Sequence, residues 1–377
     1  MRILITGGAG FIGSSLALHL IECGHEVTVL DSLLPQIHGA DGRKSALFRR
    51  IDGHARFIHA SVTDAAAWPA ALDGQEAVVH LAAETGTGQS MYELQRYAEV
   101  NVGGTALLLQ HLARQQGHSV RRIVVASSRA LYGEGRYRTV DGALAYPSAR
   151  KAEDLRAGRF EIYDAQGRAM EMLPTDEESL IHPSSVYGIT KQTQEQLVMT
   201  MGRALGIAPT ALRYQNVYGP GQSLTNPYTG ILSIFSTRIL HGRGLSIFED
   251  GRESRDFVYI DDVVSATAAA LLEPAAEGEV LGIGSGVATS VMEAARTLIA
   301  ALGREVPVEV TGAFRVGDIR HNVADLSKAR LLLGYEPRTS FAAGIERFAA
   351  WVRTQPLPDD GYERSLKELK DRGLMRG

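Results

Sequence analysis

Residues 1–13 read M-R-I-L-I-T-G-G-A-G-F-I-G, a short apolar segment followed by a glycine-rich turn. A helix-forming stretch continues to about Cys23, so the order is strand, glycine turn, helix. Gly7 allows a tight turn, Gly10 leaves the backbone open to a pyrophosphate, and Gly13 lets the helix pack closely on the strand. Unpaired N–H groups at the helix N-terminus would face the phosphates. The stretch therefore predicts the opening of a dinucleotide-binding unit.

A second apolar strand, residues 25–30, ends in Asp31. A carboxylate there suits the ribose hydroxyls of NAD and repels the 2′-phosphate of NADP. An ordinary β-α-β unit with an acidic loop would show the same order, but the agreement of strand, glycines, helix and acid favours NAD. The residues expected around the cofactor are Gly7, Gly10, Phe11, Ile12, Gly13, Asp31, Ser32, Ser61, Val62, Leu81, Ala82, Ala83, Asn101, Tyr187 and Lys191.

Composition excludes several classes of function. The chain has 377 residues, 45% hydrophobic and 22% charged, which fits a soluble globular protein of one large domain or two that share a cleft. A net charge of −4 provides no basic field for nucleic acid. The single cysteine, Cys23, excludes an internal disulfide and argues against a cysteine metal site. The early glycine turn leaves no room for a signal peptide, and no apolar run reaches the ~20 residues of a membrane span. We expect a cytoplasmic protein without a metal, a membrane or a nucleic-acid partner.

Strands and helices alternate up to residue 218, which predicts a Rossmann-type α/β fold with a doubly wound parallel sheet. Residues 134–182 form a long polar insertion with a possible hairpin turning at 165–167. Beyond Gly219 the chain becomes irregular and then predicts a smaller α/β substrate-binding domain. The expected division is 1–218 with about 255–275 for NAD, 219–254 with 276–357 for the substrate, and 358–377 as a charged tail, a solvated helix or a frayed end.

Tyr187 and Lys191 are four residues apart at the start of a predicted helix, so they share one face. A tyrosine has a pKa of about 10, which a nearby ammonium or the positive nicotinamide of NAD would lower. Ser128, at the end of the strand predicted over 122–126, could hydrogen-bond the hydroxyl that Tyr187 deprotonates. The pattern Y-x-x-x-K is common on surface helices. Downstream of a glycine turn and the Ser127-Ser128 strand end, it predicts a catalytic site at the C-terminal edge of the sheet.

These motifs resemble those of the extended short-chain dehydrogenase/reductases, the NAD-dependent nucleotide-sugar epimerases and dehydratases. The stretches that carry the resemblance are T-G-G-A-G-F-I-G with Asp31, S-S-R-A-L-Y-G at 127–133, Y-G-I-T-K at 187–191, R-Y-Q-N-V-Y-G-P-G-Q at 213–222 and R-D-F-V-Y-I-D-D at 255–262. The resemblance extends to about Trp351 and implies that Tyr187 is the base, Lys191 its modulator and Ser128 its hydroxyl partner. It also implies a nucleotide-diphosphate sugar held by Glu84, Thr85, Ser128, Arg129, Gln215, Asn216, Arg255, Arg315 and Asp318.

Departures from the family pattern narrow the reaction. In the 4,6-dehydratases a Thr-Asp-Glu run eliminates water; here Ser128 is followed by Arg129 and Ala130, and Ala130 cannot transfer a proton. Ser61 and Val62 stand where relatives often place an Asp for the adenine. A closer resemblance, to the dTDP-L-rhamnose 4-epimerases, rests on the loops D-S-L-L-P-Q-I-H-G and L-A-A-E-T-G-T-G-Q-S-M, the insertion, and N-P-Y-T-G-I-L-S-I-F at 226–235. Relatives often carry cysteine pairs in the insertion; this chain has none, so any such metal is lost.

The sequence thus favours a nucleotide-sugar C4 epimerase with bound NAD. A 4-ketoreductase or decarboxylase of the same family is the nearest alternative, and a non-catalytic NAD-binding regulator is an alternative of another class. Intact Ser128, Tyr187 and Lys191 argue against a dead site. The resemblance also implies a homodimer through helices predicted at 91–114 and 187–205, which carry apolar residues on more than one face, unless the insertion covers those faces.

Overall fold

The computed structural model describes residues 1–115, 117–226, 228 and 230–376. Positions 227 and 229 of the 226–235 motif and position 377 of the predicted tail lie outside the described residues. At the centre of the described chain is a seven-stranded sheet in the order β3-β2-β1-β4-β5-β9-β13, with every neighbouring pair parallel. The strands are β1 (Arg2–Thr6), β2 (Glu26–Asp31), β3 (Arg56–His59), β4 (Ala77–His80), β5 (Arg122–Ser128), β9 (Ala208–Tyr214) and β13 (Val280–Ile283). The predicted doubly wound Rossmann fold is confirmed.

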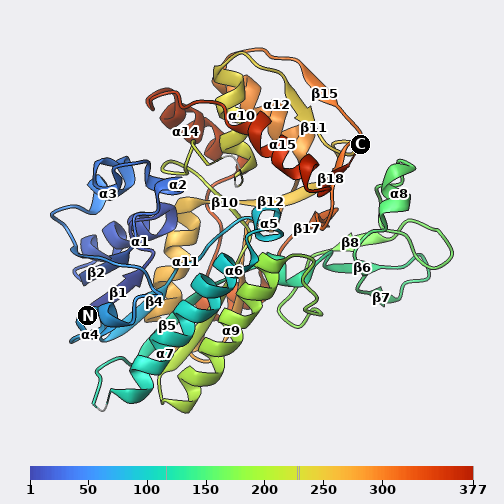
Figure 1. The fold of residues 1–377 in the computed structure, drawn as a ribbon. Helices are drawn as coiled ribbons and strands as arrows, with labels where there is room; N and C mark the ends of the chain where they lie inside the picture. The colour runs from blue at the N-terminus through green and yellow to red at the C-terminus, as the bar shows by residue number, and fades with distance from the viewer. Residues whose placement is uncertain (116, 227, 229, 377) are drawn as a thin grey trace.

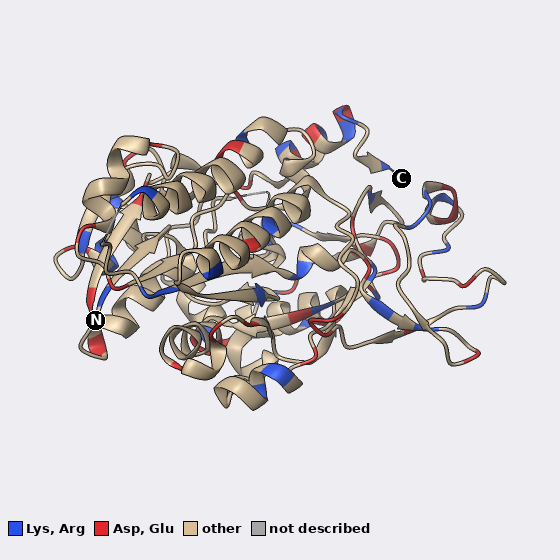
Figure 2. Ribbon diagram, turned by 90° about the horizontal axis from the view of Figure 1, so that it is seen from below, with Lys and Arg blue, Asp and Glu red and all other residues tan. Residues whose placement is uncertain are grey.

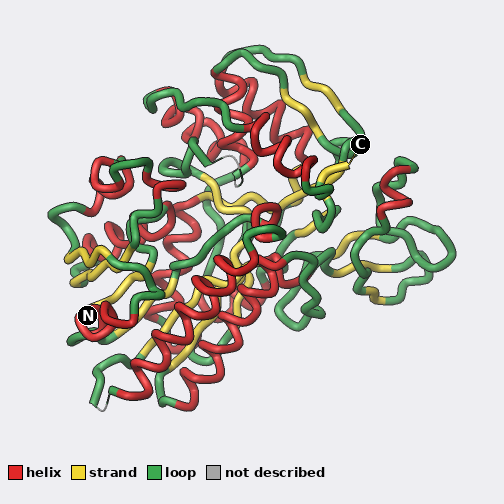
Figure 3. Tube along the Cα trace, viewed as in Figure 1, coloured by secondary structure: helices red, strands yellow, loops and turns green. Residues whose placement is uncertain are grey.

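Helices cover both faces of this sheet, as Figures 1 and 3 show. Successive strand residues point to opposite faces: Ile3 and Ile5 join a buried cluster with one helical layer, whereas Leu4 joins a separate cluster with the other. The first layer holds α1 (Phe11–Glu22), α3 (Ala46–Ile51) and α11 (Ile260–Leu272); the second holds α4 (Trp68–Leu72), α7 (Gly104–Arg114) and α9 (Val186–Ala204). Burial on both faces explains the continuous Val, Ile and Leu runs of the strands.

The helix predicted over 91–114 is divided into three pieces. A short helix α6 (Leu94–Tyr97) leads into a π-helical turn (Ala98–Gly103), and α7 completes it. The turn carries Asn101, whose side chain reaches two other segments of the chain, as described below. A π-helical turn is a common device for inserting a functional side chain into a helix.

The second part of the molecule lies beyond the C-terminal edge of the sheet (Figure 1). Its core strand is β12 (Ser254–Tyr259), flanked by β10 (Asn216–Tyr218), β14 (Ala288–Ser290) and β17 (His321–Asn322); a separate pair joins β11 (Leu245–Ile247) to β15 (Val308–Val310). Its helices are α10 (Ile231–Leu240), α12 (Val291–Leu302), α13 (Ser327–Leu333) and α14 (Phe341–Arg353). One expectation is corrected here. Residues 276–357 were assigned to the substrate-binding domain, but β13 is an edge strand of the central sheet because it pairs with β9.

The insertion projects from one side of the molecule, at the right of Figure 1. It contains a small antiparallel sheet in the order β7-β6-β8, from β6 (Arg136–Arg138), β7 (Leu144–Ala145) and β8 (Glu171–Leu173), and a short helix α8 (Ala152–Arg156). The predicted hairpin is present as an antiparallel bridge between Tyr163 and Ala169. The insertion is therefore an extension of the fold with its own small sheet and not a separate globular domain.

The C-terminal stretch differs from the predicted solvated helix or frayed end. A helix α15 (Tyr362–Asp371) does form, but Tyr362, Ser365 and Leu369 bury one face of it. The chain then adds β18 (Met375–Arg376), antiparallel to β16 (Phe314–Arg315). An amphipathic helix with apolar residues at this spacing gains stability by packing, so the tail docks. The remaining short helices are α2 (Pro35–His38) and α5 (Thr87–Ser90). Over the described residues, no helix has the length and apolarity needed to cross a membrane.

Candidate active site

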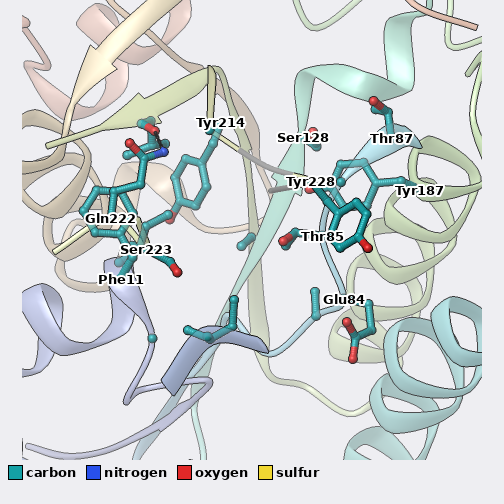
Figure 4. A pocket seen from close by; sticks show the side chains of 18 of the residues that line it. Phe11, Glu84, Thr85, Thr87, Ser128, Tyr187, Tyr214, Gln222, Ser223 and Tyr228 are labelled. Atoms are coloured by element: carbon teal, nitrogen blue, oxygen red, sulfur yellow. Dashed lines mark hydrogen bonds between the residues drawn. The ribbon is translucent and has the colours of Figure 1, made fainter. Parts of the chain in front are cut away.

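A cavity of about 840 Å³ runs along the C-terminal edge of the sheet, from the glycine turn into the second part. Every residue predicted for the cofactor or the substrate lines it except Asn101. Figure 4 shows Ser128, Tyr187, Thr85 and Glu84 on one side of this space. The carboxyl ends of parallel strands at a change of strand order are the usual ligand site of such sheets, which explains why distant motifs converge here.

The glycine turn is shaped by close backbone contacts. Gly7 has a positive φ of 68°, and a Cβ built there would lie 2.8 Å from the Ala82 nitrogen. A Cβ on Gly13 would lie 2.6 Å from the Gly8 Cα, so α1 can approach the turn only with glycine at that place. Gly10 instead has an ordinary φ of −74° and begins α1 as its N-cap. Its bare Cα and the free N–H groups of the first helical turn form a cradle that suits a pyrophosphate.

Asp31 ends β2 at the edge of the cavity, as predicted. Its carboxylate accepts hydrogen bonds from the Ala9 nitrogen at 3.0 Å and the Leu33 nitrogen at 2.8 Å, and His38 Nε2 lies 4.0 Å from it. Burial raises the pKa of Asp31, and the two N–H groups and His38 oppose that rise. The acid therefore holds the glycine turn to the second strand while its position by the cavity suits a ribose diol.

Tyr187 reaches Ser128 because α9 begins very close to the end of β5. Ser185 caps α9 by accepting from the Gly188 nitrogen at 3.2 Å. A Cβ on Gly188 would lie 2.5 Å from the Ala130 carbonyl oxygen, so glycine at this position lets the first turn of α9 close on the segment that follows Ser128. The Tyr187 nitrogen also donates to Ser90 Oγ at 3.0 Å. The Tyr187 side chain is thereby placed beside Ser128, close enough for the serine hydroxyl to lower the pKa of the tyrosine.

The electrostatics of these groups differ in part from the sequence expectation. Burial raises the pKa of Tyr187, whereas the hydrogen bond from Ser128 and the charge of Arg129 lower it. Burial lowers the pKa of Lys191 to about 7, against the charge of Glu195. Lys191, the predicted modulator, donates to Gln194 Oε1 at 2.6 Å. Arg129 is thus the cation that acts on the Tyr187 hydroxyl in this structure, a role that the sequence did not suggest.

Asn101 is the predicted cofactor residue that the structure places elsewhere. It is fully buried, and its side chain exchanges hydrogen bonds with the Glu84 backbone, at 2.7 Å from the Glu84 nitrogen and 3.1 Å to its carbonyl oxygen. Its Nδ2 also donates to Thr190 Oγ1 at 2.9 Å. Its contact with the cofactor stays a prediction, whereas the hydrogen-bond bridge, the usual role of a buried asparagine within a helix, is present. The bridge ties the loop after β4 to the helix that carries Tyr187, which keeps Glu84 and Tyr187 on the same cavity.

Arginines gather around Asp318 in the wall of the cavity. Arg255 Nη2 and Arg315 Nη2 donate to the two oxygens of Asp318, at 2.9 Å and 2.6 Å. Arg129 Nε donates to Asn216 Oδ1 at 3.0 Å. Burial alone would raise the pKa of Asp318, but the surrounding arginines hold it far below its usual range. Burial, with the charge of Arg255 as a smaller cause, lowers the pKa of Arg129 to about 10. Three arginines around one carboxylate leave a positive excess that suits a diphosphate.

The amino-acid sequence is similar to the sequences of known proteins along most of its length. The sequence model of the NAD dependent epimerase/dehydratase family matches residues 3–284. The chain belongs to this family. A dTDP-L-rhamnose 4-epimerase of Burkholderia thailandensis is 42% identical over 354 residues, which cover 93% of this chain and 94% of that protein. A UDP-glucose 4-epimerase of Mycolicibacterium smegmatis is 31% identical over 357 residues, covering 94% and 99%.

Solved structures of the epimerase/dehydratase family agree with the fold. The UDP-glucose 4-epimerase of Thermotoga maritima with UDP-glucose matches with a TM-score of 0.74 at 32% identity, covering 94% of this chain and 99% of that one. The UDP-glucuronic acid 4-epimerase of Bacillus cereus, in complex with UDP-glucuronic acid and NAD, matches with a TM-score of 0.75 at 27% identity, with the same coverage. The chain is therefore an enzyme of a nucleotide-sugar epimerase/dehydratase family with NAD as cofactor.

The residues present fit NAD in this epimerase/dehydratase family member. The glycine cradle, Asp31 at the end of β2 and Tyr187 all line the same cavity. Ser61 and Val62 line the same cavity near the expected adenine, without an acid. A metal has no such fit: among the described residues, no group of three His, Cys, Asp or Glu side chains could hold one.

Sequence reasoning missed several cavity residues. They are Tyr228, Phe248, Glu249, Glu253 and Tyr362. Each lies on an irregular loop or on the C-terminal helix, where no strand period or motif marks its direction. Burial raises the pKa of Glu253 to about 7, and its Oε2 has no hydrogen-bond partner among the described residues. The amphipathic pattern of residues 362–371 is the one signal that could have found Tyr362.

Proposed function

We propose that this protein is a nucleotide-diphosphate-sugar C4 epimerase, of the dTDP-L-rhamnose 4-epimerase type. The observation that carries the proposal is the placement of Ser128 and Tyr187 in one cavity with a glycine cradle and an arginine cluster. The 42% identity to a dTDP-L-rhamnose 4-epimerase supports the finer assignment of the sugar and base.

In the proposed reaction the Tyr187 oxygen removes the proton of the sugar 4-hydroxyl while the C4–H bond breaks. Bound NAD supplies the acceptor and later the donor of that hydride. Ser128 hydrogen-bonds the reacting oxygen, and the charge of Arg129 favours the phenolate that Tyr187 must become. The resulting 4-keto sugar turns about its diphosphate link. Return of the hydride to the other face, with the proton from Tyr187, gives the inverted alcohol.

This chemistry needs a firmly held nucleotide and a sugar that can turn. Arg255 and Arg315, aligned by Asp318, would hold the diphosphate. The sugar would occupy the space between Thr85 and Tyr187, beside the loop of Gly86. Ala130 weakens the case for dehydration, because its nitrogen donates to Ser128 Oγ at 3.1 Å and its methyl group cannot transfer a proton.

The test is incubation of the purified protein with dTDP-L-rhamnose, UDP-glucose, UDP-galactose and UDP-glucuronic acid, followed by chromatographic separation of the products. We expect inversion at C4 without net change in NADH absorbance, and fastest turnover of the dTDP sugar. Net NADH production or CO₂ release would instead identify an oxidoreductase or decarboxylase. No turnover of any nucleotide sugar would favour the non-catalytic regulator.

A further inference from the structure

One arginine of the insertion, Arg150, has a side chain that is buried against the rest of the molecule. The Arg150 side chain is 5% exposed and donates to Glu134 Oε1 at 3.1 Å, Glu249 Oε2 at 2.8 Å, and the carbonyl oxygens of Phe160 and Asp318, both at 3.1 Å. Figure 2 shows acidic and basic residues side by side where the insertion joins the rest of the chain. A guanidinium with donors in four directions fixes the relative position of the segments that it joins.

Two of these partners belong to the walls of the cavity. Asp318 is the carboxylate that aligns Arg255 and Arg315, and Arg150 holds its main chain through the carbonyl oxygen. Glu249 also lines the cavity and has a positive φ of 50°, which is unusual for a residue with a side chain. Such a conformation persists only when its surroundings hold it.

A second arginine joins the insertion to the same wall. Arg320 is fully buried and donates through Nε to Glu161 Oε1 of the insertion at 3.1 Å, and through Nη1 to Glu249 Oε2 at 3.0 Å. The Arg320 nitrogen donates to Glu134 Oε2 at 2.7 Å. Glu249 is therefore clamped between Arg150 and Arg320, and Glu134 at the root of the insertion contacts both.

Removing Arg150 would leave two buried carboxylates short of one cation, with Arg320 as their remaining partner. Glu134 and Glu249 have side chains that are only 2% and 5% exposed. A buried carboxylate oxygen that loses its donor is unfavourable, so the segments that carry Glu134, Glu249 and Asp318 would move until water or another donor replaced Arg150. Movement of Asp318 would turn both arginines that face the diphosphate position.

We propose that Arg150 is a positioning residue for the nucleotide diphosphate: through Asp318 and Glu249, the insertion holds Arg255 and Arg315 in the geometry that binds the ligand. The inference rests on the proposed function for the identity of that ligand. It assigns the insertion a role in substrate affinity. Ser128 and Tyr187 make no hydrogen bond to this network, and Arg129, which acts on Tyr187, donates to Asn216, so the chemical step should be affected less than binding.

The experiment compares Arg150→Met with wild type and with Arg168→Met. Arg168 lies in the same insertion but pairs with Asp141 and Asp164 at the surface, so its variant is a matched control for losing an arginine from the insertion. The measurements on the NAD-loaded protein are calorimetric affinity for dTDP and for UDP, KM and kcat for the turned-over sugar, bound NAD, and the unfolding temperature.

We expect Arg150→Met to weaken nucleoside-diphosphate binding and raise KM by on the order of 10- to 100-fold, with bound NAD and kcat close to wild type. Arg168→Met should bind as wild type does. An affinity of Arg150→Met equal to wild type would overturn the proposal, even with a lower unfolding temperature, since that pattern indicates a purely structural brace.

If Arg150→Met does not fold, Arg150→Lys provides the same test. Lysine keeps the positive charge but not the planar set of N–H donors of arginine, so the variant should bind dTDP more weakly than wild type. Unchanged affinity would again overturn the proposal. Failure of the proposed function is a distinct result: wild type would then bind neither dTDP nor UDP, or would bind them without epimerising a sugar.

Discussion

Replacing Gly10 with alanine should separate NAD binding from the stability of the fold. The φ of −74° and ψ of −177° at Gly10 are open to any residue. The nearest described atom to an added Cβ is the Gly7 carbonyl oxygen, at 3.2 Å, which requires a shift of a few tenths of an ångström. Alanine is a poorer N-cap than glycine by up to about 1 kcal/mol, and it recovers about 0.4–1 kcal/mol by restricting the unfolded chain. The free energy of unfolding should therefore change by less than about 1 kcal/mol.

The cofactor should respond much more strongly. The added methyl group occupies the space that the bare Gly10 Cα leaves for the pyrophosphate. An extra carbon in a close-packed site costs about 1–3 kcal/mol, which corresponds to roughly 5- to 150-fold weaker binding. The assay is the Kd of NAD after removal of bound cofactor, together with unfolding temperatures measured with and without NAD. Gly10→Ala should also lose much of the stabilisation that added NAD gives.

Two further glycines calibrate this result. Gly13→Ala would bring a Cβ within 2.6 Å of the Gly8 Cα, so it should destabilise the fold itself. Gly103→Ala, where the nearest described atom is the Ala98 carbonyl oxygen at 3.9 Å, should leave NAD binding unchanged and raise the stability of the fold by up to about 1 kcal/mol. Wild-type affinity of Gly10→Ala for NAD would refute the assignment of the turn as the pyrophosphate cradle. Destabilisation as large as that of Gly13→Ala would mean that the Gly7 carbonyl oxygen cannot move far enough to admit the added methyl group.

Four other predictions can be checked independently. Tyr187→Phe should keep the fold and bound NAD but lower turnover by on the order of 10² to 10⁴, and near-normal epimerisation by this variant would mean that another group is the base. Burial lowers the pKa of Lys191 to about 7, below the 10.5 of the unfolded chain, so the unfolded state binds more protons between these values. The NAD-free protein should thus become more stable as pH rises from about 7 towards 10, and Lys191→Met should lose that gain in denaturant titrations across the pH range. Denaturation of the purified protein should release NAD, whereas NADP as the main nucleotide would contradict the role given to Asp31. Light scattering at micromolar concentration should find a homodimer, since Leu94 and Ile189, 50% and 51% exposed on α6 and α9, leave an apolar face to cover; a monomer would count against it.

The sequence alone predicted the central sheet, the glycine-rich turn and the groups proposed for catalysis. Gly7 is required by its own backbone conformation, and the apolar runs around it have the length and burial of parallel strands. Asp31 and Ser128 follow from that sheet, because they end strands whose carboxyl ends share one edge. These features follow from local properties of the sequence: the backbone conformation that each residue allows and the spacing of apolar residues along a strand or helix.

The tertiary structure alone decided the features that join distant parts of the chain. A hydrogen-bond bridge is a common role of a buried asparagine within a helix, but only the packing around the π-helical turn decides that Asn101 joins the Glu84 loop to α9. Arg150 lies 168 residues from Asp318, and no motif in the sequence around either residue predicts the contact. The C-terminal helix docks because its apolar stripe finds a complementary surface. Pairing between long, flexible side chains depends on which segments the fold brings together, and no local pattern in the sequence records that.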